Sequence, residues 1–124
     1  MPSRFSPLIR WALLVVLPLA AACARESGPS LAAPEALELA RAHKLTIVDI
    51  RRPEEWRQTG VAEGAARIDM RHPQFADAVL AQVGGDRNAP IALICRTGNR
   101  TSQMQAVLRD QGFTKVYHIG EGMA

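Results

Sequence analysis

The sequence lacks several features that mark large classes of proteins. Its 124 residues contain only two cysteines and three histidines, and no spacing among them is typical of metal ligands. Basic residues form no stripe with interleaved aromatics, so nucleic-acid binding has no support. Internal repeats are absent as well. The length suits one domain, and we expect no metal site and no nucleic-acid partner.

A long apolar run is also missing. The apolar stretch over residues 11–22 is shorter than the roughly 20 residues that a membrane-spanning helix needs. It follows Arg4 and Arg10 and precedes small residues, which is the layout of a secretory signal. We therefore predict a signal peptide over 1–22, a tether over 23–34 and a folded domain over 35–124. Without these two arginines, 13 basic residues remain against 12 acidic ones, so the rest is nearly neutral.

The first cysteine lies directly after the signal. Residues 20–23, Ala-Ala-Ala-Cys, resemble the bacterial lipobox, in which the cysteine is lipidated and becomes the mature N-terminus. That motif usually has leucine where Ala20 stands, and simple cleavage of an A-x-A site is the alternative. We favour lipidation of Cys23, because a cysteine directly after such a run is uncommon by chance. The expected location is the periplasm, with a membrane anchor through this lipid.

Short apolar strands alternate with helical patterns in the rest of the chain. Helices are predicted over 34–43, 52–60, 72–85 and 101–112, and strands over 44–50, 65–70, 91–95 and 113–119. Such alternation is typical of βαβ units with right-handed crossovers and a parallel sheet. The predicted fold class is α/β, a three-layer α/β/α sandwich.

The second cysteine, Cys95, ends an apolar strand and begins a loop that opens into a helix. Ligands of open α/β sheets bind beyond the carboxyl ends of the strands. The first amides and the dipole of the helix favour negative charge there, Arg96 and Arg100 add positive charge, and Gly98 allows successive amides to turn inward. These effects would lower the pKa of Cys95 from about 8.5 into the range of roughly 3.5 to 7.5. A buried, inert cysteine is the alternative, but the loop favours a nucleophile.

Two chemistries use a cysteine in such a loop. Cysteine-dependent phosphatases have C-x5-R, with a loop sized for a tetrahedral phosphate. Here four residues separate Cys95 from Arg100. The shorter loop suits a smaller charged group, such as a terminal sulfur on the cysteine, and makes a phosphatase or arsenate reductase the less favoured interpretation.

Two segments resemble the rhodanese family, the single-domain sulfurtransferases. Residues 95–122, CRTGNRTSQMQAVLRDQGFTKVYHIGEG, are similar to the family's active loop, helix, last strand and glycine turn. Residues 48–65, VDIRRPEEWRQTGVAEGA, are similar to its first motif. The family normally continues into a tryptophan-containing segment and a terminal helix. This sequence stops at Ala124, so we expect one face of the sheet to be partly uncovered.

The resemblance implies a two-step sulfur transfer that requires no metal or organic cofactor. The Cys95 thiolate attacks the outer sulfur of thiosulfate or a similar donor, sulfite leaves, and a Cys95 persulfide remains. A thiol or cyanide acceptor then takes that sulfur. A sulfur carrier or interaction module at the membrane, without turnover, is the alternative from another class of function.

The resemblance also implies roles for the residues around Cys95. The backbone amides of the loop would hold the persulfide charge, Arg96 would point outward to an anionic donor, and Arg100 would close the loop against an acidic partner. Asp49 is a candidate for that partner. The implied substrate-binding loop is Arg96, Thr97, Gly98, Asn99 and Arg100, and the supporting residues are Asp49 and Arg51.

The remaining polar residues receive structural interpretations. We predict a surface or packing role for Glu54, Glu55 and Trp56, and helix capping for Thr101 and Ser102. The histidines are treated as structural: His43, His72 and His118.

Overall fold

The computed structural model describes residues 28–96 and 98–120. The predicted signal peptide and Cys23 lie outside these residues, as does Thr97 of the predicted loop. Within them, no helix combines the length and the apolar character that crossing a membrane would require.

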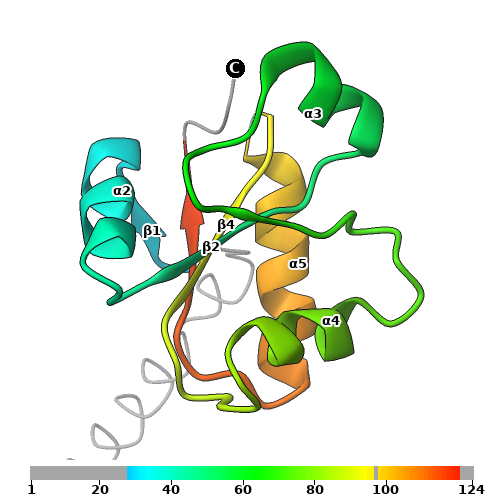
Figure 1. The fold of residues 1–124 in the computed structure, drawn as a ribbon. Coiled ribbons are helices and arrows are strands. Elements are labelled where there is room, and N and C mark those ends of the chain that lie inside the picture. Colours follow the sequence, from blue (N-terminus) through cyan, green and yellow to red (C-terminus); the bar gives the residue numbers. More distant parts are fainter. Residues whose placement is uncertain (1–27, 97, 121–124) are drawn as a thin grey trace, which may run out of the picture.

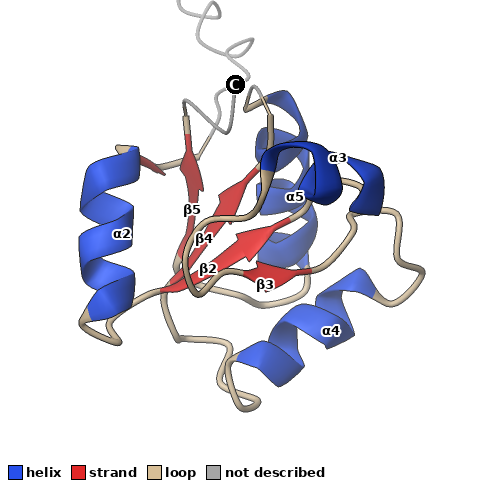
Figure 2. Ribbon diagram, turned by 45° about the horizontal axis from the view of Figure 1, so that its top comes forward, coloured by secondary structure: helices blue, strands red, loops and turns tan. Residues whose placement is uncertain are grey.

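A parallel sheet forms the middle layer. The described residues contribute five strands in the order β1-β5-β4-β2-β3. Every neighbouring pair is parallel, so the carboxyl ends of the strands share one edge of the sheet (Figure 2). The strands are β1 (Ser30–Leu31), β2 (Thr46–Asp49), β3 (Ala66–Arg67), β4 (Ile91–Ile94) and β5 (Val116–Ile119).

Helices cover both faces of this sheet. Helix α2 (Ala33–Arg41) packs on one face, whereas α4 (Phe75–Gln82) and α5 (Asn99–Asp110) pack on the other (Figure 1). Helix α3 (Pro53–Thr59) lies at the carboxyl edge, near the start of α5 (Figure 1). The predicted α/β sandwich with a parallel sheet is confirmed.

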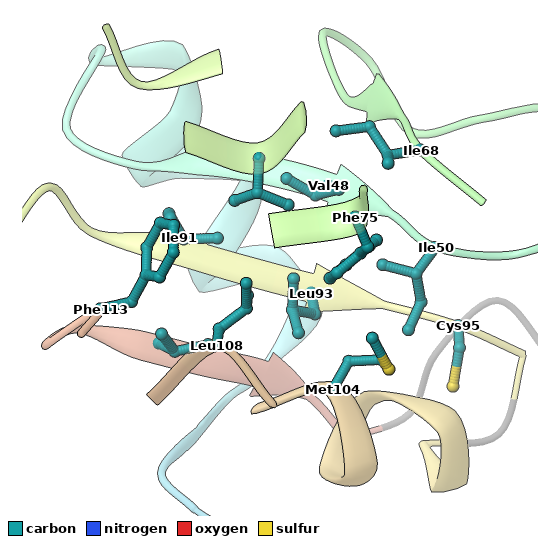
Figure 3. Close-up of a cluster of buried hydrophobic side chains, with 12 residues drawn as sticks. Val48, Ile50, Ile68, Phe75, Ile91, Leu93, Cys95, Met104, Leu108 and Phe113 are labelled. Atoms are coloured by element: carbon teal, nitrogen blue, oxygen red, sulfur yellow. The ribbon is translucent and has the colours of Figure 1, made fainter. Parts of the chain in front are cut away.

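The alternation of side chains along the central strand explains why its sequence is continuously apolar. Ile91 and Leu93 of β4 belong to the cluster beneath α4 and α5, and Ala92 and Ile94 belong to the cluster beneath α2. All four are buried, as expected for a parallel strand that is covered on both faces. Cys95 follows directly and lies at the end of the first cluster (Figure 3).

Strand β1 is not predicted by the sequence and lies within the expected tether. Its two residues pair with His118 and Ile119 of β5. The buried Gln105 fixes the preceding segment, because its side-chain amide accepts from the Gly28 N–H at 3.2 Å and donates to the Pro29 carbonyl at 3.0 Å. A two-residue strand has no periodicity of its own, so its position depends on partners more than 70 positions away in the sequence.

Helix α5 also differs from its prediction, because it begins at Asn99 instead of Thr101. Gly98 is the residue before the helix and has a φ of 99°, in the left-handed region that glycine tolerates. A side chain there would also place a Cβ 2.9 Å from the carbonyl oxygen of Gly120. The turn between Cys95 and α5 therefore requires glycine for two separate reasons.

Candidate active site

The sulfur of Cys95 lies at the carboxyl edge of the sheet, immediately after β4. The residue is 1% exposed, and its Sγ accepts a hydrogen bond from the Gly98 amide at 3.0 Å. The left-handed turn at Gly98 brings this amide back toward the sulfur. Among the described residues of the loop, Gly98 is the one whose amide donates to Sγ, and this donor favours negative charge on the sulfur.

Thr101 is a site residue that the sequence analysis missed. Its side chain is fully buried, and its Oγ1 lies 4.0 Å from Sγ of Cys95. The expected capping role is wrong, because Thr101 does not accept from an amide of the first turn. Its hydroxyl instead donates to the Gly98 carbonyl at 2.8 Å. The error follows from the helix start, which lies two residues earlier than predicted and moves Thr101 into the first turn.

Arg100 closes the loop against Glu55, not against Asp49 as predicted. Its two terminal nitrogens each donate to one carboxylate oxygen at 2.8 Å. These hydrogen bonds are the main reason why the pKa of Glu55 is lowered from 4.5 to about 2, and they raise the pKa of Arg100. Glu55 therefore has a specific role, in place of the surface or packing role expected for it. The pair connects α3 to the first turn of α5 across 45 residues of sequence.

Asp49 does not pair with Arg100, because its carboxylate already accepts hydrogen bonds from another arginine, Arg51. The Arg51 guanidinium donates from Nε to Asp49 Oδ1 at 2.9 Å and from Nη2 to Oδ2 at 2.8 Å. Both residues are buried, at 0% and 1% exposure. Arg51 also donates to Thr59 Oγ1 and to the Gly60 carbonyl, each at 2.6 Å. The pair therefore ties the end of β2 to the end of α3, the helix that carries Glu55.

The outer part of the predicted loop is exposed. Arg96 and Asn99 are both exposed, and Thr97 lies outside the described residues. Arg96 also lines a small depression at this edge of the sheet, together with Arg51, Glu55, Gln58 and Thr59. The exposed Arg96 side chain places positive charge beside this depression, and Cys95 is the residue before it in the sequence. The role of Arg96 toward a donor stays a prediction.

The part of the chain that the structure describes contains no set of side chains suited to bind a metal ion. No group of three or more histidine, cysteine, aspartate or glutamate side chains lies close enough together there to hold an ion.

The sequence of this chain also matches a known protein family. Residues 32–124 match the family model of the rhodanese-like domain. The chain belongs to this family. A thiosulfate sulfurtransferase, GlpE of Pseudomonas aeruginosa, is 32% identical to this rhodanese-like chain over 90 residues, which cover 73% of the chain and 76% of the relative.

Solved structures agree with this assignment. The polysulfide-sulfur transferase homodimer of Wolinella succinogenes superposes with a TM-score of 0.61 at 26% identity, covering 78% of this chain and 71% of that one. Human single-domain sulfurtransferase TSTD1 superposes with a TM-score of 0.61 at 20% identity, covering 77% and 91%. The expectation of a rhodanese-family sulfurtransferase enzyme is confirmed.

Proposed function

We propose that this rhodanese-like protein transfers a sulfane sulfur from thiosulfate, or a similar small anionic donor, to a thiol through a persulfide on Cys95. The observation that carries the proposal is the sulfur of Cys95 at the end of β4, with the Gly98 amide 3.0 Å away. A fixed amide donor beside a sulfur stabilises the anionic form that attacks and the anionic persulfide that results.

The transfer takes two steps. In the first, the Cys95 thiolate attacks the sulfane sulfur of thiosulfate, the sulfur–sulfur bond of the donor breaks, and sulfite leaves with the electron pair. In the second, the thiolate of the acceptor attacks the outer sulfur of the persulfide. The acceptor then carries the sulfur, and Cys95 leaves as a thiolate that is ready for another donor.

The surroundings of Cys95 support a small donor. The residue is 1% exposed, so its sulfur lies below the surface, where a terminal atom would reach it more readily than a broad molecular surface. The exposed Arg96 would attract a negatively charged donor, and the Arg100–Glu55 pair would hold the loop in place during both steps. No residue in this scheme requires a metal or an organic cofactor.

Incubating the purified protein with thiosulfate and cyanide tests the proposal. We expect thiocyanate to form with the wild-type protein and to fall to background with Cys95→Ala and Cys95→Ser. An equal rate for the wild type and both variants, or no thiocyanate at all, would reject it. Hydrolysis of an aryl phosphate by the wild type would revive the phosphatase alternative.

A sulfur carrier without turnover is the second candidate, and the burial of Cys95 favours it because burial would protect a persulfide from solvent. Intact mass after incubation with thiosulfate separates the two candidates. A stable adduct of about 32 Da, one sulfur atom, that persists in the presence of cyanide supports the carrier. An adduct that cyanide removes as thiocyanate supports the enzyme.

We also propose that the protein is exported and held at a periplasmic membrane surface by a lipid on Cys23. The support is in the sequence, where the apolar run over residues 11–22 follows Arg4 and Arg10 and ends directly before Cys23. Cell fractionation tests this, because Cys23→Ser should release the protein from the membrane fraction.

A further inference from the structure

A single buried hydroxyl lies between the catalytic sulfur and a histidine on β5. Oγ1 of Thr101 is 4.0 Å from Sγ of Cys95, 3.5 Å from Nδ1 of His118 and 2.8 Å from the Gly98 carbonyl oxygen. Thr101 is fully buried, so water does not substitute for any of these partners. The hydroxyl therefore links His118 to the sulfur of Cys95.

The direction in which the Thr101 hydroxyl donates depends on whether Nδ1 of His118 carries a hydrogen. A threonine hydroxyl has one hydrogen to donate and two lone pairs with which it accepts. If Nδ1 of His118 is bare, it competes with Gly98 and with an anionic sulfur for that one hydrogen. If Nδ1 carries a hydrogen, it donates to Oγ1, and the threonine hydrogen is left for the Gly98 carbonyl or for the sulfur.

We propose that His118 is a positioning residue for sulfur transfer, whose Nδ1–H donates to Thr101 and thereby directs the threonine hydroxyl toward the anionic sulfur of Cys95. The proposal rests on the proposed function, since it assigns a role around the same nucleophile. A hydroxyl that accepts from His118 is also a stronger donor, because hydrogen bonds in a chain polarise one another. His118 touches neither the donor nor the reacting sulfur in this scheme and acts through Thr101.

Among residues 28–96 and 98–120, the other neighbours of His118 carry no charge toward it. Its register partners are Ser30 of β1 and Leu93 of β4, and both are neutral. On α5, Gln105 is neutral, Arg100 is turned to Glu55, and Arg109 lies beside Gly28. Burial lowers the pKa of His118 below its usual 6.5, which disfavours the charged imidazole. Within the described part of the chain, the titratable group that faces it is Cys95, across Thr101.

The pH profile of Cys95 alkylation by iodoacetamide tests this coupling, because it reports the thiolate without requiring sulfur transfer. Thr101→Val removes the hydroxyl and preserves the shape of the side chain, and His118→Leu removes the ring nitrogen. We expect each variant to move the midpoint of the profile upward by about 0.5 to 1 pH unit, which is roughly three- to tenfold less thiolate below the midpoint. The double variant should shift no further than Thr101→Val alone.

His118→Asn separates hydrogen bonding from titration. Its side-chain amide can donate from the place of Nδ1 but cannot change charge, so we expect a midpoint close to that of the wild type. The wild-type profile should also show a second inflection below pH 6.5 that His118→Asn lacks, because a charged imidazole favours the thiolate. His43→Asn is the matched control: His43 has a φ of 61°, which asparagine tolerates, and it precedes β2 at the opposite edge of the sheet.

Two results would overturn the inference: an unchanged midpoint in His118→Leu, or shifts of the single variants that add in the double variant. Circular dichroism shows whether His118→Leu folds. If it does not, the profile of His118→Asn decides, and a second inflection that persists in this variant overturns the inference. If no thiocyanate forms but the variants still shift the alkylation midpoint as expected, the proposed function is rejected and this inference stands.

Discussion

Two Asp-X-Arg segments fold into the same local ion pair in very different surroundings. Asp49 and Arg51 lie at the end of β2, and Asp69 and Arg71 lie just after β3, the neighbouring strand. In each, the arginine amide and Nε donate to Oδ1 of the aspartate, and Nη2 donates to Oδ2, at 2.8 Å in the first segment and 2.6 Å in the second. The first pair is buried, whereas the side chain of Arg71 is 55% exposed.

The two pairs share one geometry and differ in burial, so burial decides what each pair does for the fold. After both β2 and β3, the carboxylate two residues before the arginine accepts hydrogen bonds from both its amide and its guanidinium. Burial removes water, so the Arg51 guanidinium needs further acceptors and finds them in Thr59 and Gly60 at the end of α3. The exposed Arg71 side chain remains in contact with water, and its hydrogen bonds to Asp69 connect it to no other helix or strand.

The largest expected effect is that of Arg51→Met. It leaves the Asp49 carboxylate buried without its counterion and frees the end of α3, so we expect a loss of about 3–5 kcal/mol in the free energy of unfolding. Urea unfolding monitored by circular dichroism measures it. A loss as small as that of the matched variant Arg71→Met would show that burial does not distinguish the two pairs.

Glu55→Gln tests the intermediate case, the half-buried pair between Glu55 and Arg100. We expect a loss of about 1 kcal/mol at neutral pH. Because the pKa of Glu55 falls from 4.5 to about 2 in the folded protein, the pair stabilises the fold fully above pH 4.5. That stabilisation disappears as the pH falls toward 2.

Unfolding of the wild type and Glu55→Gln at several pH values between 6 and 2 measures this dependence. The difference between the two proteins should shrink as the solution becomes more acidic. A difference that stays constant over this range would mean that the carboxylate charge does not hold Arg100.

Arg71→Met should give the smallest effect, at most about 0.5 kcal/mol, because exposed ion pairs contribute little. Its clearer signature is the pKa of Asp69, which the hydrogen bonds from Arg71 hold below its usual 3.8. Titration of the Asp69 carboxyl by NMR should show a rise toward the usual value in this variant. A loss of more than 2 kcal/mol would place the second pair in the same class as the first.

The fold was largely predictable because its signals are local. The continuous apolar run of β4, the glycine at the turn before α5 and the alternation of strands with helices all identify elements within short windows of sequence. The place of Cys95 was predictable for the same reason, since a strand end, a loop and a helix start follow one another along the chain. Strand β1 was not, because its hydrogen bonds come from β5 and Gln105.

The site required the tertiary structure wherever a contact joins distant segments. From the sequence, Asp49 and Glu55 are both acidic residues of the first motif, and either could face Arg100. The fold decides for Glu55, because Arg51 already satisfies Asp49 inside the core. Thr101 and His118 likewise come together only because α5 packs beside β5.

The sequence by itself determined the α/β class and the place of Cys95 between a strand and a helix, because periodicity and turn residues act over a few residues. Only the tertiary structure decided which Asp-X-Arg pair is buried, which carboxylate holds Arg100 and which hydroxyl lies beside the sulfur. These depend on desolvation and on side chains brought together from separate elements, which no short window of sequence contains.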